Sequence, residues 1–245
     1  KLRKGRNRKN SGRIIIEGQK EIFLAQQQGL GNLEVFNCPE MSGKPASEVR
    51  GLPFKVTEVT PQVFGRICYR ENPDGWIAMA DRPNHELTDA KAGKIVLVLD
   101  GMEKPGNIGA ILRTAAAAGV EVVFLVNSGA DIYNPNTIRS SLGAVLGLPV
   151  ISTTDSELTV WLEQNDFKLY AADTYGPKAY YEFKYQPPLA LVIGAEHQGV
   201  SSFWLERSCS VHIPMTGPID SLNASVSAAI LIYEVKKQLD CGKTV

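Results

Sequence analysis

The pattern of hydrophobic and polar positions predicts two regions of alternating strands and helices. In the first region, residues 13–18 (RIIIEG) form a short β-branched run that predicts a strand, and residues 19–28 predict a helix. Residues 33–37 predict a second strand, and the run WIAMA at residues 76–80 predicts another. We therefore expect residues 1–80 to form a small α/β domain.

A polar, proline-containing stretch at residues 81–94 predicts a linker to a second domain. The continuous apolar run IVLVL at residues 95–99 is typical of a strand buried on both faces of a parallel sheet. A helix at residues 108–118 should follow it, and a long helix at residues 222–239 should end the domain. Between these two helices we expect strands at residues 120–126, 150–151, 167–172, 189–195 and 211–213, and helices at residues 137–146 and 156–164. Strands alternating with helices predict an α/β domain with a mainly parallel sheet over residues 95–245.

The charge of the chain is balanced overall but unevenly distributed. The sequence holds 26 basic and 26 acidic side chains, and the first 13 residues contain seven of the basic ones and no acid. The other 232 residues carry 19 basic and 26 acidic side chains, a net charge of −7. A basic arm on an acidic body is typical of nucleic-acid binding, although a disordered, solubilising terminus has the same composition. The arm's basic residues are Lys1, Arg3, Lys4, Arg6, Arg8, Lys9 and Arg13.

Composition narrows the class of protein further. With 44% hydrophobic and 21% charged residues the chain is expected to be globular. No apolar run reaches the about 18 residues of a membrane-spanning helix, and no signal peptide is predicted. Four scattered cysteines favour a reduced, cytoplasmic location, and the spacing of the cysteines and three histidines predicts no metal site.

Polar residues follow three of the apolar strands, where ligands bind in such sheets. The first segment, KPGNIGAILRT at residues 104–114, contains Asn107 and Arg113. Asn107 can instead be the N-cap of the following helix, and Arg113 can be a surface arginine that packs its stem on apolar neighbours. The spacing of Gly106 and Gly109 departs from the G-x-G-x-x-G pattern, which argues against a nicotinamide-dependent oxidoreductase.

The second segment is IGAEHQG at residues 193–199, where two glycines bracket Glu196 and allow a sharp turn. His197 in this segment has the character of an exposed loop residue rather than a catalyst. The third segment combines IPM at residues 213–215 with SLNAS at residues 221–225. Ser221 can simply cap the last helix, whereas Asn223 in its first turn is unfavourable for a helix and indicates a hydrogen-bonding task.

In this order and with these strands between them, the three segments resemble the SPOUT superfamily of RNA methyltransferases, and more closely its SpoU/TrmH ribose 2′-O-methyltransferase branch. PGNIGAILRTA resembles the first motif of that branch, LVIGAEHQGV the second and IPMTGPIDSLNASVSAAILIYE the third. The segments IIIEGQKEIFLA and YRENPDGWIAMA resemble the substrate-binding domain of many members.

The resemblance implies a carboxyl-terminal domain with a deep trefoil knot, which pattern rules alone do not predict. It also implies a homodimer whose active site is assembled at the interface, with S-adenosylmethionine as the cofactor. By correspondence of the motifs, the residues expected at the cofactor are Gly194, Ile213, Leu222, Asn127, Glu196, Gly199 and Met215.

The implied reaction is in-line transfer of a methyl group to a ribose 2′-hydroxyl of RNA. By the same correspondence, Arg113 lies at that hydroxyl. Because arginine stays protonated, it would stabilise developing alkoxide charge and hold the adjoining phosphate rather than act as a simple base, with phosphate-assisted proton removal as the alternative. Glu196 would fix the guanidinium, Asn107 would orient the ribose or Arg113, and Ser221 and Asn223 would bind the nucleotide or brace the site.

The amino-terminal domain favours large-subunit ribosomal RNA over transfer RNA as the substrate. A catalytically silent RNA-binding module with the same fold is the alternative from another functional class.

Overall fold

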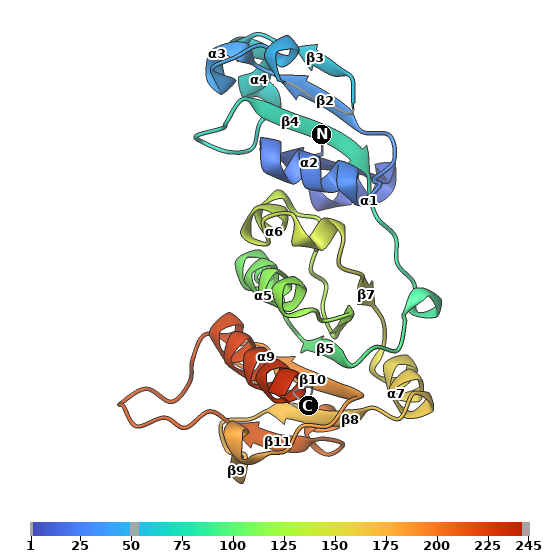
Figure 1. Cartoon of the computed structure of the whole chain (residues 1–245), viewed down its shortest axis with the longest axis vertical. Coiled ribbons are helices and arrows are strands. Elements are labelled where there is room, and N and C mark those ends of the chain that lie inside the picture. Colours follow the sequence, from blue (N-terminus) through green and yellow to red (C-terminus); the bar gives the residue numbers. More distant parts are fainter. Residues whose placement is uncertain (1, 50–53, 242–245) are drawn as a thin grey trace. The chain divides into compact units, whose positions relative to one another are not determined.

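The computed structural model describes residues 2–49 and 54–241, which group into two compact units. Unit 1 comprises Lys1–Asn84 and Asp131–Gly147, and unit 2 comprises His85–Ala130 and Leu148–Val245. Lys1, which the sequence analysis counts in the basic arm, lies outside the described residues. Figure 1 shows the elements of both units.

Unit 1 is built on a four-stranded mixed sheet with the strand order β1-β4-β2-β3. β4 pairs antiparallel with both β1 and β2, and β2 pairs parallel with β3. Ile14 and Ile16 of β1 are fully buried, as the β-branched run predicts. The elements of this unit are α1 (Gly5–Ser11), β1 (Arg13–Glu17), α2 (Gln19–Gln27), β2 (Glu34–Asn37), α3 (Pro39–Ser42), η1 (Ala46–Glu48), β3 (Val56–Glu58), α4 (Pro61–Ile67), β4 (Trp76–Asp81), α6 (Pro135–Ser140) and η3 (Ala144–Leu146).

The basic arm is part of this fold, so its interpretation as a disordered terminus is wrong. Residues 5–11 form α1, which ends at Gly12 in the left-handed conformation (φ 62°). Arg8 is buried in the unit, where its guanidinium pairs with Asp131. The arm is ordered because this buried arginine has a partly exposed carboxylate partner far along the chain.

Asp131–Gly147 groups with unit 1 although it lies inside the region predicted as the second domain. The single helix predicted over residues 137–146 is wrong, because α6 ends at Ser140 and the 3₁₀ turn η3 begins at Ala144. Gly143 between them has φ 82°, a conformation that stops the α-helix.

Unit 2 contains a seven-stranded sheet with the order β7-β6-β5-β10-β8-β11-β9, and every pairing in it is parallel. This confirms the predicted α/β fold with a parallel sheet. All six residues of β5 are buried, as the apolar run predicts. The elements are η2 (Leu87–Asp89), β5 (Ile95–Asp100), α5 (Pro105–Ala118), β6 (Val122–Val126), β7 (Val150–Ser152), α7 (Asp155–Gln164), β8 (Lys168–Ala172), β9 (Lys178–Ala179), η4 (Tyr180–Glu182), β10 (Leu189–Gly194), α8 (Ser202–Leu205), β11 (Cys209–His212) and α9 (Ala224–Cys241).

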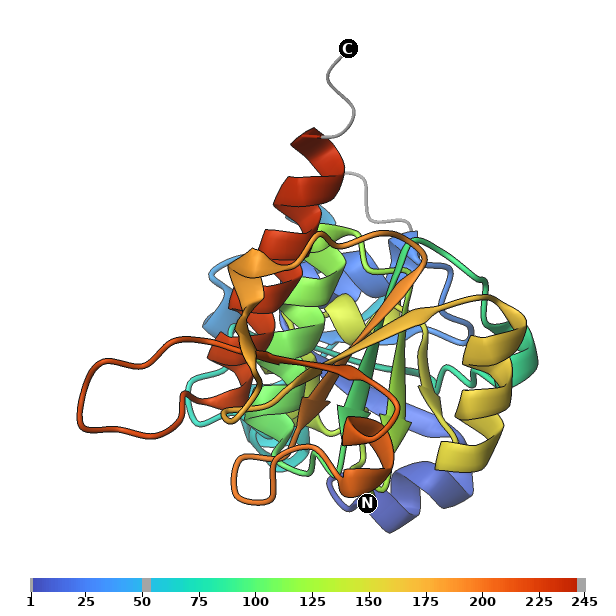
Figure 2. The same ribbon diagram turned by 90° about the horizontal axis from the view of Figure 1, so that it is seen from below.

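Helices cover both faces of this sheet, as a buried parallel sheet requires. α5 and α9 lie side by side on one face, with α7 on the other (Figure 2). Leu158 and Leu162 of α7 and Trp204 of α8 pack into one apolar cluster with β5, β6 and β10. The loop between β11 and α9 projects away from the rest of the unit. Over the described residues, no helix combines the length and apolar character needed to cross a bilayer.

The starts of two helices differ from the sequence predictions. α5 begins at Pro105, with Lys104 as its N-cap, because proline is favoured at the first helical position. Asn107 therefore lies within the first turn and is not the N-cap. α9 begins at Ala224, so Asn223 precedes the helix and does not lie in its first turn.

Candidate active site

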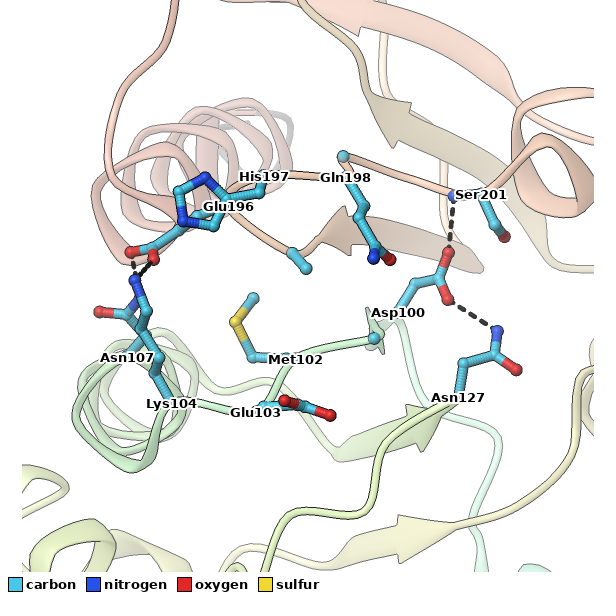
Figure 3. Close-up of a pocket in the computed structure, with 13 residues that line it drawn as sticks. Asp100, Met102, Glu103, Lys104, Asn107, Asn127, Glu196, His197, Gln198 and Ser201 are labelled. Atoms are coloured by element: carbon cyan, nitrogen blue, oxygen red, sulfur yellow. Dashed lines mark hydrogen bonds and ion pairs between the residues drawn. The ribbon is translucent and has the colours of Figure 1, made fainter.

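The loops that follow β5 and β10 enclose a pocket at the carboxyl edge of the sheet in unit 2. The two strands pair in parallel, with Asp100 opposite Gly194 at their ends. The pocket has a volume of about 460 Å³, which lies within the about 300–1,000 Å³ range of ligand sites. We name it the polar pocket; it is lined by residues 100–104, Asn107, Asn127, residues 195–199 and Ser201 (Figure 3).

Glu196 joins three segments of the chain at this pocket. Lys104 and Asn107, from the start of α5, each donate a hydrogen bond to one of its carboxylate oxygens. Asn223, just before α9, donates from Nδ2 to Oε1 of Glu196 at 2.8 Å. The structure thus brings together Asn107, Glu196 and Asn223 from the three predicted motifs. The hydrogen bonds from Lys104 and Asn107 hold the pKa of Glu196 below its ordinary value, so the carboxylate is ionised at neutral pH.

Asn223 both caps the start of α9 and donates a hydrogen bond to Glu196. Its Oδ1 accepts from the backbone N–H of Ser225 at 2.9 Å and from the Ser225 hydroxyl at 2.6 Å, which is the geometry of a helix N-cap. Since the side-chain carbonyl is held by the helix, the amide group is free to donate to Glu196, and also to Oδ1 of Asn107 at 3.2 Å. Capping therefore fixes the orientation of the amide at the site.

A smaller pocket of about 110 Å³ shares Ala195, Glu196 and Gly199 with the polar pocket. We name it the apolar pocket, because Ile193 and the residues near the start of α9 give it several hydrophobic side chains. Among the predicted cofactor residues, those that line it are Gly194, Glu196, Gly199, Ile213, Met215 and Leu222. Ser221 also lines the apolar pocket, whereas Asn127 lines only the polar one.

The turn after β10 depends on glycine, as the sequence predicts. A Cβ atom on Gly194 would lie 2.0 Å from the carbonyl carbon of Gly199, so no side chain fits there. Gly199 has φ 67°, a conformation that glycine adopts at low cost. Ala195 and Gly199 form an antiparallel bridge across the turn, which keeps Glu196 between the two pockets.

Arg113 lies on the exposed surface of α5 and lines neither of these pockets. Within residues 2–49 and 54–241 its guanidinium makes no hydrogen bond or ion pair. Within the described residues of this chain, Glu196 makes no hydrogen bond or ion pair with Arg113; its carboxylate accepts from Lys104, Asn107 and Asn223. In this chain the Asn107 amide donates to Glu196.

The polar pocket contains a second hydrogen-bonded group that the sequence analysis missed. Asp100 is 3% exposed, and its carboxylate accepts from the backbone N–H of Ser201 at 2.7 Å and from Nδ2 of Asn127 at 2.8 Å (Figure 3). Nδ2 of Asn127 also lies 3.1 Å from Oδ2 of Asp155, whose Oδ1 accepts from Trp204 at 2.9 Å. The sequence did carry a signal for Asp100, because this acidic residue directly follows a wholly apolar run.

The sequence predicts that His197 is an exposed loop residue and that the cysteines and histidines form no metal site. His197 is exposed and lines the polar pocket, in agreement with its interpretation as a loop residue. The described part of the chain contains no group of three or more His, Cys, Asp or Glu side chains arranged to hold a metal ion.

Comparison with known proteins identifies the family. The model of the SpoU rRNA methylase family matches residues 94–233, and that of the MRM3-like substrate binding domain matches residues 1–78. The chain belongs to the SpoU family. This confirms the resemblance drawn from the three motifs and from the amino-terminal region.

SpoU relatives match over nearly the whole chain. The 23S rRNA (guanosine(2553)-2′-O)-methyltransferase RlmP of Bacillus subtilis is 31% identical over 96% of this chain and 93% of its own length. A crystal structure of an RNA 2′-O ribose methyltransferase is 37% identical, covers 97% of this chain and 93% of that one, and superimposes with a TM-score of 0.85. The SpoU methyltransferase AviRb from Streptomyces viridochromogenes, solved with the cofactor AdoMet, is 26% identical with a TM-score of 0.84, over 98% and 95% of the two chains.

Proposed function

We propose that this chain is an S-adenosylmethionine-dependent RNA methyltransferase that modifies a ribose 2′-hydroxyl of large-subunit ribosomal RNA. The observation that carries the proposal is the convergence of Asn107, Glu196 and Asn223 between two pockets at the carboxyl edge of the sheet. These residues come from three separate motifs, and packing alone does not require three polar side chains to meet there.

The apolar pocket has the chemistry that S-adenosylmethionine needs. Ile213, Met215 and Leu222 offer an apolar surface for a flat base, while Asp173 offers a carboxylate for a cationic ligand. When bound, the cofactor supplies an activated methyl group on a sulfonium. The pocket is about 110 Å³, below the about 300 Å³ of a typical ligand site. We therefore expect the exposed loop at residues 214–221 to rearrange when the cofactor binds.

Arg113 would act on the RNA substrate. Its guanidinium remains protonated at neutral pH, so it would stabilise negative charge on the 2′-oxygen and hold the neighbouring phosphate. Asn107 and Asn223 would keep Glu196 oriented between the two pockets, and Ser221 would hydrogen-bond the nucleotide. Since Arg113 has no partner within the described residues, it is available for a ligand or a second subunit.

Ribosomal RNA is favoured as the substrate because the similarity includes the amino-terminal region. RlmP of Bacillus subtilis, whose name gives 23S rRNA as its substrate, matches 96% of this chain. Unit 1 in addition presents the basic residues Lys4, Arg6 and Lys9 on its exposed surface, where they can contact phosphates. We place such an enzyme in the cytoplasm, with its ribosomal substrate.

The active form would be a homodimer, with a trefoil knot in the carboxyl-terminal domain. α9 supports the dimer, because Val226 and Tyr233 are 46% and 49% exposed and lie two turns apart on one side of the helix. Apolar side chains of this size in a row favour burial against another chain. A second copy would also bring side chains to the exposed Arg113.

The test is transfer of a labelled methyl group from S-adenosylmethionine to RNA by the full chain. We expect label in 23S rRNA at one ribose 2′-position, located by its resistance to alkaline cleavage. Label in transfer RNA alone would contradict the ribosomal assignment. Measurable cofactor binding without label in any RNA would instead indicate the catalytically silent module.

A further inference from the structure

Several polar side chains that line the polar pocket have no hydrogen-bond partner within the described residues. Asp100 and Glu196 in this pocket are held by hydrogen bonds, but Glu103 and Gln198 make none within the described part of the chain. Both are exposed. Figure 3 shows the amide of Gln198 pointing into the pocket from the loop after β10, and Glu103 on the loop after β5. The pocket therefore offers one free amide and one free carboxylate to a ligand.

Met102 lies against this pocket beside the polar groups, with very little of its side chain exposed. Its thioether side chain points into the pocket (Figure 3), while the residue as a whole is only 2% exposed. With so little of Met102 exposed, a ligand in this pocket would be recognised mainly by the polar groups of Glu103 and Gln198.

We propose that the polar pocket binds an unstacked guanine base of the RNA substrate. Glu103 would accept hydrogen bonds from N1–H and the 2-amino group, and Gln198 would donate to O6. The inference rests on the proposed function for its ligand, RNA, and adds which base the pocket selects. Single-stranded bases splayed out and bonded along their Watson–Crick edges are the usual targets of sequence-specific RNA recognition.

Guanine fits these groups better than the other three bases. Its Watson–Crick edge carries two adjacent donors, which match the two oxygens of a carboxylate, and a neighbouring acceptor, which matches an amide N–H. Uracil places acceptors on both sides of its single donor, so a carboxylate would repel it. Adenine and cytosine each place a ring acceptor beside their amino group, so they too would set one acceptor against Glu103.

The first test measures binding of nucleotides to the full chain and does not require methyl transfer. The probes are GMP, UMP and IMP, and IMP lacks the 2-amino group of GMP. Binding is followed by NMR through the side-chain amide signals of Gln198. We expect GMP to bind about 10- to 100-fold more tightly than UMP, the range for one good bidentate contact. IMP should fall between them.

Substitution of Glu103 separates recognition of guanine from a general effect on the protein. Glu103→Gln replaces the two acceptors by one acceptor and one donor, so we expect the preference for GMP over IMP to fall to within about twofold. Glu163→Gln, an exposed glutamate on α7 that lines neither pocket, is the matched control and should keep the wild-type preference. S-adenosylmethionine affinity should not change in either variant.

The outcomes distinguish this inference from the proposed function. Equal affinity for GMP and UMP, or a GMP preference that survives Glu103→Gln, overturns the guanine site even if the chain methylates RNA. A guanine preference that depends on Glu103, in a chain that methylates no RNA, supports the site and contradicts the enzymatic proposal.

Discussion

The guanidinium of Arg8 lies on the carboxylate of Asp131, 123 residues further along the chain, with Nε 2.9 Å from Oδ2. The Arg8 side chain is 2% exposed and that of Asp131 26%. Nη1 of Arg8 also donates to the carbonyl of Leu2 at 2.5 Å. The pair therefore attaches the basic amino-terminal helix to the segment that carries α6, inside unit 1.

Removing Asp131 should destabilise the protein more than removing Arg8. Asp131→Ala leaves Arg8 buried without a counter-charge, and we expect a loss of about 3–5 kcal/mol in the free energy of unfolding. Arg8→Met should cost less, because the remaining carboxylate of Asp131 is partly exposed and can be hydrated. Urea denaturation followed by circular dichroism measures both. A loss for Asp131→Ala no larger than that of Glu71→Ala, an exposed loop control, would contradict a structural role for the pair.

The same geometry determines which basic residues can bind RNA. Arg3 donates to the carbonyls of Arg66 and Cys68, and Arg13 pairs with Glu34. Together with Arg8, these arginines are already used within unit 1. The exposed side chains of Lys4, Arg6 and Lys9 make no hydrogen bond or ion pair within the described residues, so they remain available for phosphates.

Replacing Lys4, Arg6 and Lys9 together with alanine should weaken RNA binding and reduce its dependence on salt. Each lost phosphate contact lowers the slope of log K against log [salt] by about 0.7–0.9, so we expect a reduction of about 2–3. Fluorescence anisotropy over a salt series measures the slope, with Lys91→Ala/Lys184→Ala as an exposed control. An unchanged slope would mean that α1 does not contact the phosphates. Deletion of residues 1–9 is a poorer test, because it also removes Arg8.

The ionisation of Glu196 gives a prediction about pH. Hydrogen bonds from Lys104 and Asn107 lower its folded-state pKa below the ordinary value of 4.5. Its contribution to stability is therefore fully present above pH 4.5 and is lost as the pH falls through the depressed folded value. We expect the carboxyl ¹³C resonance of Glu196 to titrate with a midpoint below pH 4.5. In Lys104→Met this midpoint should move to higher pH. A midpoint at or above pH 4.5 in the unaltered chain would contradict the hydrogen bonds from Lys104 and Asn107 to Glu196.

The local sequence predicted the strands of unit 2 well, but it could not predict contacts between residues far apart in the chain. The run IVLVL is apolar at every position, which only a sheet covered on both faces accommodates, and β5 is buried throughout. By contrast, burial of Arg8 depends on Asp131, and the partners of Glu196 lie 27, 89 and 92 residues away. No local pattern encodes such pairs. The sequence therefore placed Asn107, Glu196 and Asn223 among the candidate residues, but it did not show that their side chains touch.

The start of α5 shows how a local signal can mislead. Asn107 is a favourable N-cap residue, but Pro105 two positions earlier already fixes the backbone angle of the first helical residue. The helix begins there, and the Asn107 side chain is released to bond Glu196. Two competing start signals were present, and the proline determined the boundary.

Substitution of Arg113 should separate methyl transfer from cofactor binding. Its side chain lines neither pocket, so Arg113→Ala should leave S-adenosylmethionine affinity within about twofold of the wild-type value. We expect kcat to fall at least about 100-fold, the usual effect of removing a group that stabilises an oxyanion. Arg113→Lys should recover only part of the rate, because lysine lacks the planar fork that holds a phosphate. Turnover of Arg113→Ala within tenfold of wild type would contradict its role at the 2′-oxygen.

The exposed side of α9 predicts how the chain associates. Val226, Ile230 and Tyr233 recur at intervals of four and three residues, so they form one stripe along the helix. If this stripe is buried against a second copy, Tyr233→Glu places a charge in that interface, and we expect a dimer-to-monomer shift in light scattering after size exclusion. Methyl transfer should fall with it, since the active site is then incomplete. Val160→Glu changes an apolar residue of α7 that is 53% exposed and should leave the mass unchanged. A wild-type chain that elutes as a monomer, or a Tyr233→Glu variant that remains dimeric, would show that α9 is not the interface.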